Sequence, residues 1–362
     1  MGFLHRTFLA LTKPAASGPM QKVNERIAVK IGHRFPQGKV GISFCRALGD
    51  NILRHEGGNT CRTATLLTSA KVVFEFTQAT KMLYFLGTDD HTDEIPVANL
   101  LMRTVRKGDV FFDLGANVGF YAFLVAPLCG KRGSVHAFEP NPNLVPNLLR
   151  SAELNSSTCD VVVNGVAVGR EDGGEISLYF SSDAQDIGVT STYPHPWLDS
   201  NSKITVPVTS IDAYRECHKL ERIDYVKIDI EGAELDALQG MTETFRRHPP
   251  LLIICELWRT VQKINNAEFL PDPAVPSTVK VFDFLSERGY EPMYISKGGF
   301  FERGIRRNDL LELQTNKINA AFIAPQLKTC RPDLFVLQNI YERSLKGCSK
   351  QFAKAWYIPE VK

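Results

Sequence analysis

Short apolar runs alternate with helical patterns along the middle of this chain. Nearly continuous apolar runs predict strands at 110–113, 134–139, 160–163, 225–229 and 251–256, and later runs at 291–295 and 320–323 would complete a sheet. Strands without polar alternation are typical of a parallel sheet that helices cover on both faces. Helical patterns such as 120–128 and 281–289 separate these runs. The pattern therefore predicts an α/β fold with a seven-stranded, mostly parallel, doubly wound sheet.

The presence or absence of this alternation between apolar runs and helical patterns divides the chain into three parts. Residues 99–325 carry the alternating pattern and are expected to form one domain. Residues 1–98 are mixed, and two short runs at 71–76 and 81–86 predict an N-terminal extension with short strands. The periodicity weakens beyond the central domain, so residues 326–362 are expected to form a C-terminal tail on its outside.

Bulk composition narrows the class of protein. The 362 residues include 42 basic and 40 acidic side chains, a net charge of +2, which disfavours nucleic acid as a partner. No stretch reaches the roughly 18 apolar residues that cross a bilayer, so no integral membrane segment is expected. The eight cysteines lack the Cys-x-x-Cys spacing of zinc sites, which favours free thiols in a reducing compartment.

The N-terminal 24 residues contain basic side chains and histidine but no acid. An organellar presequence and the basic terminus of a cytoplasmic protein both fit this pattern. We expect a cytoplasmic protein, with an organellar location through the basic N-terminus as the alternative. The sequence does not determine the oligomeric state.

The strongest motif begins at the predicted strand 110–113. Asp113 stands at its carboxyl end, and Gly115 and Gly119 follow in a Gly-x-x-x-Gly turn that opens into an apolar helix. Ligands of doubly wound sheets bind outside the carboxyl ends of the strands, and glycines let a backbone come close to a ligand. Asp113 can accept a hydrogen bond from an ammonium group of such a ligand. These residues therefore predict a cofactor site.

A second acidic residue supports this site and, together with the turn, limits the class of cofactor. Glu139 ends the next predicted strand, 26 positions after Asp113, and a carboxylate there can accept both ribose hydroxyls of a nucleoside. The turn departs from the dinucleotide pattern Gly-x-Gly-x-x-Gly, because Asn117 occupies the place of the glycine that pyrophosphate requires. A nucleoside cofactor without pyrophosphate fits better, and S-adenosylmethionine is one.

At these residues the chain resembles the FkbM family of S-adenosylmethionine-dependent methyltransferases. The matching stretches are 113–119, 138–140, 210–212 and the specific 226–234 (Val-Lys-Ile-Asp-Ile-Glu-Gly-Ala-Glu), with weaker matches at 254–256 and 319–325. The resemblance covers about residues 94–325 and implies a Rossmann-like sheet of the class I methyltransferase type. It implies cofactor contacts at Asp113, Gly115, Asn117, Gly119 and Glu139. It also implies O-methylation of a small-molecule acceptor, commonly the hydroxyl of a sugar.

Chemistry is expected at the fourth strand, which neighbours the first strand in a doubly wound sheet. Lys227, Asp229 and Glu231 share one side of this strand by the period of two. A buried lysine needs a carboxylate partner, which Asp229 or Glu256 can supply. We expect these four residues to form a charge network that positions the acceptor, with one carboxylate as general base. Glu231 and Glu234 also suit the first turn of the next helix, where acids favour the helix dipole.

The sequence offers weaker candidates beside this network. An Asp-x-Glu pair can hold a divalent cation, but no further ligand stands at a telling interval, so no metal is expected. His195 is another candidate base, in a proline-flanked loop of the insertion 170–212. This insertion, with strands expected at 175–180 and 203–208, is a candidate acceptor lid, as is the proline-rich loop 270–277.

Two other function classes stay open at this point. A non-catalytic cofactor-binding module would keep the fold without turnover, because fold alone does not fix function. A dinucleotide-dependent oxidoreductase is disfavoured by the missing glycine pattern. Nucleic-acid methylation is disfavoured by the balanced charge.

Overall fold

The structure is a computed structural model that describes most of the chain. The described residues are 19–34, 39–56, 60–88, 94–181, 190–191, 198–258, 262–264, 267–269, 278–311 and 317–335. The candidate base His195, the loop 270–277 and the end of the expected tail, 336–362, lie outside them. In the described part of the chain, no helix has the length and apolar character to cross a membrane.

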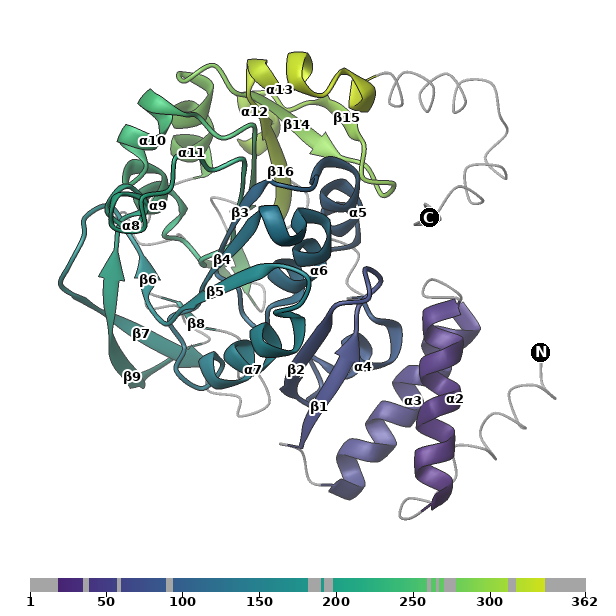
Figure 1. Ribbon diagram of the computed structural model, residues 1–362. Helices are drawn as coiled ribbons and strands as arrows, with labels where there is room; N and C mark the ends of the chain where they lie inside the picture. The colour runs from purple at the N-terminus through teal and green to yellow at the C-terminus, as the bar shows by residue number, and fades with distance from the viewer. Residues whose placement is uncertain are drawn as a thin grey trace.

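The centre of the fold is an eight-stranded sheet with the order β15-β14-β16-β11-β10-β3-β4-β5 (Figure 1). Its strands are β3 (Val110–Leu114), β4 (Ser134–Phe138), β5 (Asp160–Asn164), β10 (Tyr225–Ile228), β11 (Leu252–Trp258), β14 (Glu291–Ile295), β15 (Phe301–Gly304) and β16 (Lys317–Ile323). The block from β11 to β5 is parallel. β16 pairs antiparallel with β11, β14 pairs antiparallel with β16, and β15 pairs antiparallel with β14. The predicted Rossmann-like fold is confirmed, with all seven expected strands and β15 as an unpredicted eighth.

Helices cover both faces of this sheet, which explains the continuous apolar runs. Alternate strand residues enter two separate cores: Phe111 and Tyr225 pack on one face, and Phe112 and Val226 on the other. The first core is covered by α5 (Glu94–Thr104), α6 (Phe120–Cys129), α7 (Val145–Asn155) and α13 (Pro325–Cys330). The second is covered by α8 (Ile211–Cys217), α9 (Glu234–Gln239), α10 (Thr242–Arg247), α11 (Thr278–Ser286) and α12 (Arg307–Leu311).

The N-terminal part adds a helix pair and a hairpin beside α7 (Figure 1). Its elements are α2 (Pro19–Arg34), α3 (Lys39–Glu56), β1 (Cys61–Thr65), β2 (Lys71–Glu75) and α4 (Lys81–Leu86). The strand expected at 71–76 is confirmed as β2, which pairs antiparallel with β1. The strand expected at 81–86 is wrong, because these residues form α4. The helix buries Met82 and Phe85 against α2 and α3, and Gly87 ends it in a left-handed conformation with φ of 65°.

The outer edge of β2 is fixed to α7 by polar side chains. The Ser151 hydroxyl accepts a hydrogen bond from the Val73 N–H at 2.8 Å. Asn155 accepts from the Lys71 N–H at 2.9 Å and donates to the Lys71 carbonyl at 2.6 Å. A strand edge that would otherwise lie unpaired against a helix is thus satisfied by a buried polar row of that helix. This attachment holds the hairpin firmly on the central domain.

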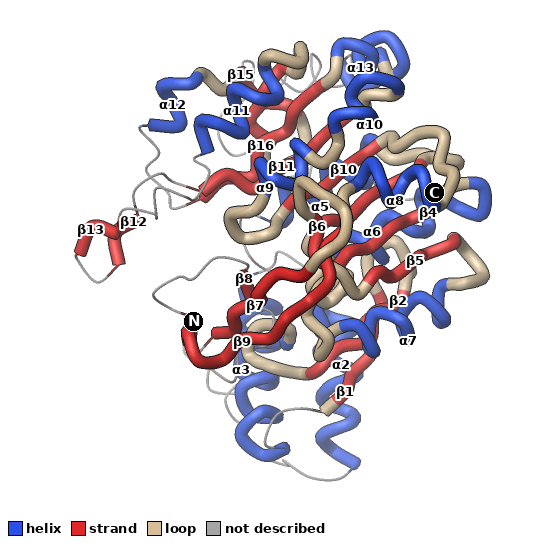
Figure 2. Tube along the Cα trace, turned by 90° about the vertical axis from the view of Figure 1, so that its left-hand side faces the viewer, coloured by secondary structure: helices blue, strands red, loops and turns tan. Residues whose placement is uncertain are grey.

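A second sheet of four strands forms the insertion after β5. Its order is β6-β9-β7-β8, with β6 (Ala167–Val168), β7 (Glu175–Ser181), β8 (Thr190–Ser191) and β9 (Leu198–Thr209). The strands expected at 175–180 and 203–208 are confirmed as β7 and β9, whose long ribbons lie in front in Figure 2. A separate small hairpin is formed by β12 (Gln262–Ile264) and β13 (Ala267–Phe269).

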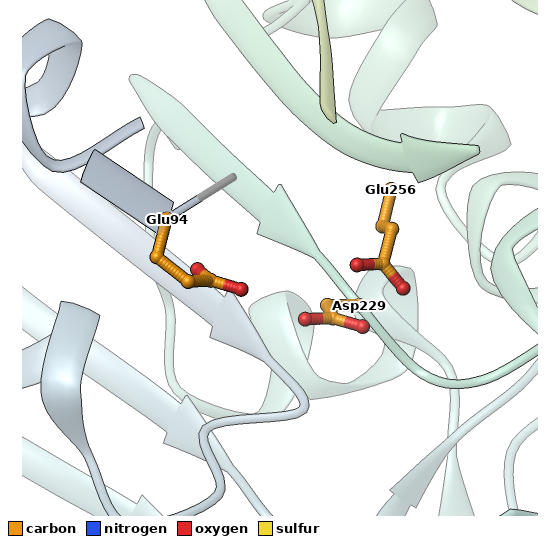
Figure 3. A group of neighbouring side chains, drawn as sticks. All are labelled: Glu94, Asp229 and Glu256. Carbon is orange, nitrogen blue, oxygen red and sulfur yellow. The ribbon is translucent and has the colours of Figure 1, made fainter. Parts of the chain in front are cut away.

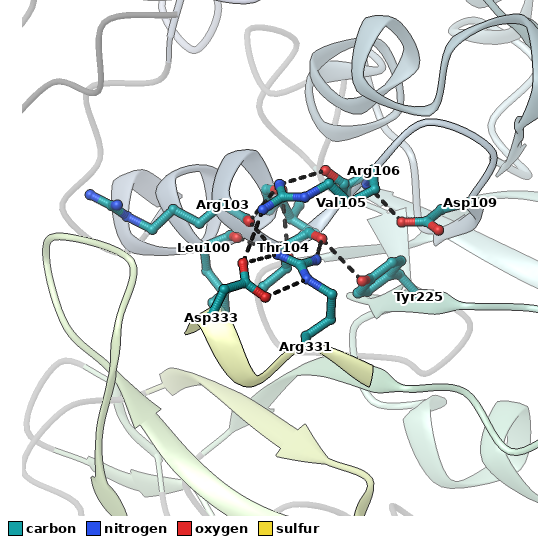
Figure 4. Close-up of polar contacts among 10 residues, drawn as sticks. Leu100, Arg103, Thr104, Val105, Arg106, Asp109, Tyr225, Arg331 and Asp333 are labelled. Carbon is teal, nitrogen blue, oxygen red and sulfur yellow. Dashed lines mark hydrogen bonds and ion pairs between the residues drawn. The ribbon is translucent and has the colours of Figure 1, made fainter. Parts of the chain in front are cut away.

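The described part of the expected tail is attached to the end of α5 (Figure 4). The Arg331 guanidinium donates to the carbonyls of Thr104 and Arg103 and pairs with Asp333 at 3.0 Å. The Tyr225 hydroxyl of β10 donates to the same Thr104 carbonyl at 3.1 Å. The last carbonyls of a helix have no partners within it, so these donors satisfy the end of α5 and fix its position.

Candidate functional site

A cavity of about 340 Å³ opens at the carboxyl ends of β3, β4 and β10. This is the position where doubly wound sheets bind ligands, and the volume lies in the range of small-molecule sites. Its lining comes from the turn after β3, the ends of β4 and β10, the four-stranded sheet, the β1–β2 hairpin region and the start of α5. Gly115, Asn117 and Glu139 line it, as do Lys227, Asp229 and Glu231.

The turn after β3 is shaped by three residues with positive φ. Gly115 has φ of 83°, and a Cβ there would lie 1.8 Å from the Asp229 carbonyl oxygen. Gly119 has φ of 89°, and a Cβ there would lie 2.6 Å from the Phe123 ring. Asn117 adopts φ of 51°, a conformation that asparagine tolerates better than most residues. The two glycines are therefore required first by close packing within the protein, against β10 and within α6.

Glu139 links this turn to the end of β4. Its carboxylate accepts hydrogen bonds from the Asn117 N–H at 2.7 Å and the Asn141 N–H at 2.9 Å. The residue is 4% exposed, and its burial raises the pKa of the carboxyl to about 7, although the two backbone bonds act in the opposite direction. A buried carboxylate on the cavity wall is stabilised by further hydrogen-bond donors. The position of Glu139 therefore fits the predicted contact with two ribose hydroxyls.

Asp113 lies behind the cavity rather than on it. The residue is fully buried, and neither carboxylate oxygen makes a hydrogen bond with the described residues. Burial raises the pKa of Asp113 to about 7, against the opposing charge of Lys227. Its predicted contact with an ammonium group, directly or through water, stays a prediction. Because Asp113 does not line the cavity, the contact needs a water or a shift of the turn. Gly119 likewise lies outside the lining.

Lys227 and Asp229 form the predicted ion pair at the end of β10. The Lys227 ammonium lies 2.9 Å from an Asp229 carboxylate oxygen, and the lysine is opposite Asp113 in the strand register. The ammonium also lies 4.9 Å from the centre of the Tyr121 ring. Burial alone would lower the pKa of Lys227, but the Asp229, Asp113 and Glu94 carboxylates outweigh it and hold the pKa above its usual value. The lysine is therefore charged.

Glu94 joins this network from the start of α5, and the sequence analysis missed it. Oxygens of Glu94, Asp229 and Glu256 lie within 4.8 Å of one another, and Figure 3 shows their carboxylates turned toward each other. The Tyr121 hydroxyl donates to the Glu94 carboxylate. Three carboxylates at this spacing could hold a cation. Among the described residues, the Lys227 ammonium is the positive charge that acts on Glu94 and Asp229. Glu256 is 1% exposed and does not line the cavity.

The two acids after β10 differ in their surroundings. Glu231 was expected in the first turn of a helix, but this is wrong: it precedes α9 and has φ of 52°. Glu231 lines the cavity, and its carbonyl accepts a hydrogen bond from the Ser191 hydroxyl at 2.8 Å. Glu234 does lie in the first turn of α9, where it accepts from the Gly232 N–H at 3.0 Å. The structure thus gives Glu234 the expected structural contact.

Segments far from the motifs complete the cavity. Thr190 and Ser191 of β8 line one side, so the predicted lid does reach the site. Glu75, the last residue of β2, and Thr77 and Thr80, which follow it, also line the cavity. No short-range signal in the sequence marks these residues, because their role depends on how the hairpin is attached to α7.

Comparisons with known proteins place a large part of the chain in one methyltransferase family. Residues 113–292 match the family model described as "Methyltransferase FkbM domain". The chain is 27% identical over 157 residues to the hexuronic acid methyltransferase AglP of Haloferax volcanii, covering 43% of this chain and 60% of that protein. It is 26% identical over 145 residues to methyltransferase 1 of Beauveria bassiana, covering 36% of this chain and 57% of that protein. The matched region thus spans under two thirds of either relative.

Solved structures overlay only partly. Fibrillarin from Aeropyrum pernix has a TM-score of 0.36 and 12% identity, covering 72% of this chain and 93% of that chain.

Proposed function

We propose that this chain, whose residues 113–292 match the FkbM methyltransferase domain, uses S-adenosylmethionine to methylate a hydroxyl group of a sugar, glycolipid or other small molecule. The observation that carries the proposal is the arrangement of Glu139 and the Lys227–Asp229 pair around one cavity. Glu139 is placed for a nucleoside, and Asp229 is placed for an acceptor beside it.

The residues present fit the cofactor. The turn at Gly115 and Asn117 presents backbone to the cavity, and the Glu139 carboxylate lies on its wall. Asp113 adds a buried acid behind the turn, which favours a cationic ligand in front of it. When bound, S-adenosylmethionine supplies an electrophilic methyl group on a sulfonium. The protein's contribution is then to align an acceptor oxygen with that methyl group and to exclude water, which together supply about 7 kcal/mol or more of rate enhancement.

We assign the base to Asp229. It lines the cavity with 21% of its side chain exposed, while Lys227 beside it is almost fully buried. The ammonium holds the carboxylate in one orientation beside the cavity, where the carboxylate can accept the proton of an acceptor hydroxyl. Glu231 is the nearest alternative on the same wall. Buried Glu256 acts, on this proposal, by fixing the network around Asp229.

The acceptor class is supported by the polar lining and by one relative. Thr77, Thr80, Thr190 and Ser191 place hydroxyl groups around the cavity, and such groups suit an acceptor that is itself rich in hydroxyls. A carbohydrate acceptor also agrees with the name of the Haloferax relative, a hexuronic acid methyltransferase.

Isotope transfer tests the proposal directly. The purified chain is incubated with methyl-labelled S-adenosylmethionine and a panel of glycosides, and the products are identified by mass spectrometry. We expect label on a glycoside oxygen, and we expect Asp229→Asn to remove it while cofactor binding persists. Cofactor binding with no transfer to any hydroxyl would instead favour a non-catalytic binding module.

A further inference from the structure

Part of the cavity wall lies outside the region that matches the FkbM domain. The match begins at residue 113, yet Glu75, Thr77, Thr80 and Glu94 line the cavity from earlier in the chain. We call these four residues the N-terminal wall. They line the same cavity as Asp229 and Glu231, and a carboxylate oxygen of Glu94 lies within 4.8 Å of one of Asp229.

The N-terminal wall is held in place by specific contacts. Thr77 and Thr80 form a tight turn, in which the Thr77 N–H donates to the Thr80 hydroxyl at 2.9 Å and that hydroxyl donates to the Glu75 carbonyl at 2.5 Å. The preceding strand β2 is bonded to Ser151 and Asn155 of α7. A wall fixed in this way is preorganised, so it can discriminate between acceptors without a change of shape.

The Glu94 end of the wall is fixed separately. Glu94 accepts a hydrogen bond from the Tyr121 hydroxyl, and the far end of its helix α5 is fixed by Arg331. Both ends of the wall are thus attached to the central domain through different elements.

The charge of the cavity is strongly one-sided. Among the described residues that line it, five are acidic (Glu75, Glu94, Glu139, Asp229 and Glu231) and one is basic (Lys227). The single lysine is already paired with Asp229. Two of the acids come from the N-terminal wall, so the wall increases the excess of negative charge. Like charges repel strongly in a partly buried site, where water screens them poorly.

We propose that the N-terminal wall selects the acceptor: a neutral or amino-bearing polyhydroxy molecule, and not one that carries a carboxylate or phosphate. The inference rests on the proposed function and makes it narrower. The carboxylates of Glu75 and Glu94 accept hydrogen bonds from the acceptor's hydroxyl or ammonium groups and reject anions, which is specificity through an unfavourable contact with the wrong ligand. On this point the chain differs from the hexuronic acid methyltransferase that it resembles, whose named substrate carries a carboxylate.

Matched acceptors test this directly. The full chain, saturated with S-adenosylhomocysteine, is titrated at pH 7.5 with methyl glucoside, methyl glucosaminide and methyl glucuronide, and binding is followed by calorimetry and ligand-observed NMR. We expect the neutral and amino sugars to bind at least tenfold more tightly than the uronate. The variant Glu75→Gln should reduce this ratio at least threefold. Its control is Glu153→Gln, the same substitution at an exposed position of α7, and it should leave the ratio unchanged.

The other possible outcomes of these titrations overturn either the inference alone or the proposed function as well. Tighter or equal binding of the uronate overturns the inference, as does an equal ratio in the Glu75 and Glu153 variants. If S-adenosylhomocysteine binds and no sugar does, the inference fails while the cofactor half of the proposed function stands. If S-adenosylhomocysteine itself does not bind the folded protein, the proposed function fails, and the inference fails with it.

Discussion

The cavity has a wall at the strand ends and the N-terminal wall, and the two are positioned by different kinds of contact. The wall at the strand ends, with Glu139 and the Lys227–Asp229 pair, is made by residues next to strands that pair directly in one sheet. The N-terminal wall reaches the same space through a hairpin that is attached to α7 by side chains. The first is built by the topology that sheets of this type share, and the second comes from residues outside the stretch that matches the FkbM family model. We therefore expect the first to hold the cofactor and the base, and the second to choose the acceptor.

The largest effect is expected from Asp229→Asn. Loss of the base should lower kcat by ~10²–10⁴-fold, because a positioned general base is typically worth that much. Cofactor affinity should change little, since the predicted cofactor contacts lie on β3 and β4. Asp160→Asn, an exposed position at the opposite end of β5, is the matched control. Normal turnover in the Asp229 variant would assign the chemistry to another residue, with Glu231 tested next.

Glu139→Gln should act on the cofactor. The substitution removes a charged acceptor of hydrogen bonds, each worth ~1.5–3 kcal/mol, so the dissociation constant of S-adenosylmethionine should rise about tenfold to a hundredfold. Calorimetry measures it. A variant that binds the cofactor as tightly as the original would show that the nucleoside lies elsewhere, which would also break the distinction between the two walls.

Cofactor affinity should also depend on pH. Burial raises the pKa of Asp113 and of Glu139 to about 7, so both are largely protonated at pH 6 and ionised at pH 8. A cationic cofactor with ribose donors favours the ionised forms, so affinity should rise with pH by up to about tenfold for each of the two carboxyls over this range. The stability of the cofactor-free protein should change with pH in the opposite direction to the affinity. The two acids retain their protons in the folded state, so stability should fall as pH rises from about 4 to 7.

Asp113→Asn separates these contributions. This variant removes one of the two titrating carboxyls and should reduce the pH dependence of binding, which calorimetry at pH 6 and pH 8 measures. An unchanged pH profile would assign the whole effect to Glu139 or to the ligand.

The smallest effect is expected at the attachment of the N-terminal wall. Ser151→Ala leaves the buried N–H of Val73 without its acceptor, which should cost about 1–3 kcal/mol of unfolding free energy. It should raise KM for the acceptor severalfold while kcat and cofactor affinity stay near their original values. Ser156→Ala, at the exposed end of α7, is the control. Equal changes in acceptor and cofactor binding would mean that the hairpin supports the whole domain rather than one wall.

The central sheet could be predicted because its signals are local. A strand that is covered on both faces appears in the sequence as a short apolar run, whatever its neighbours are. Each of the seven runs predicted in the central domain formed a strand. The run 81–86 was equally apolar but became α4, because three elements surround it and a helix buries Met82 and Phe85 while leaving Tyr84 partly exposed. Burial on several sides does not distinguish a strand from a short helix.

The candidate site was predicted in part for a related reason. The pair Lys227–Asp229 followed from strand periodicity and from the cost of a buried charge. Glu94 could not be found in this way, since it meets Asp229 only after α5 is placed across the sheet. The acid Asp212, within the matched stretch 210–212, accepts from the N–H groups of Glu243 and Thr244 at the start of α10. A motif residue can thus be explained by helix capping without touching a ligand.

The position of β16 bears on how the protein is made. This strand lies between β11 and β14, although it follows both in the chain. While the ribosome is still synthesising the residues before 317, β11 has a bare edge and β14 lacks the neighbour that joins it to the sheet. Emerging chains with exposed strand edges are prone to aggregate and to bind chaperones. Completion of the sheet must therefore wait until synthesis has passed Ile323, and expression of a fragment that stops earlier should yield insoluble protein.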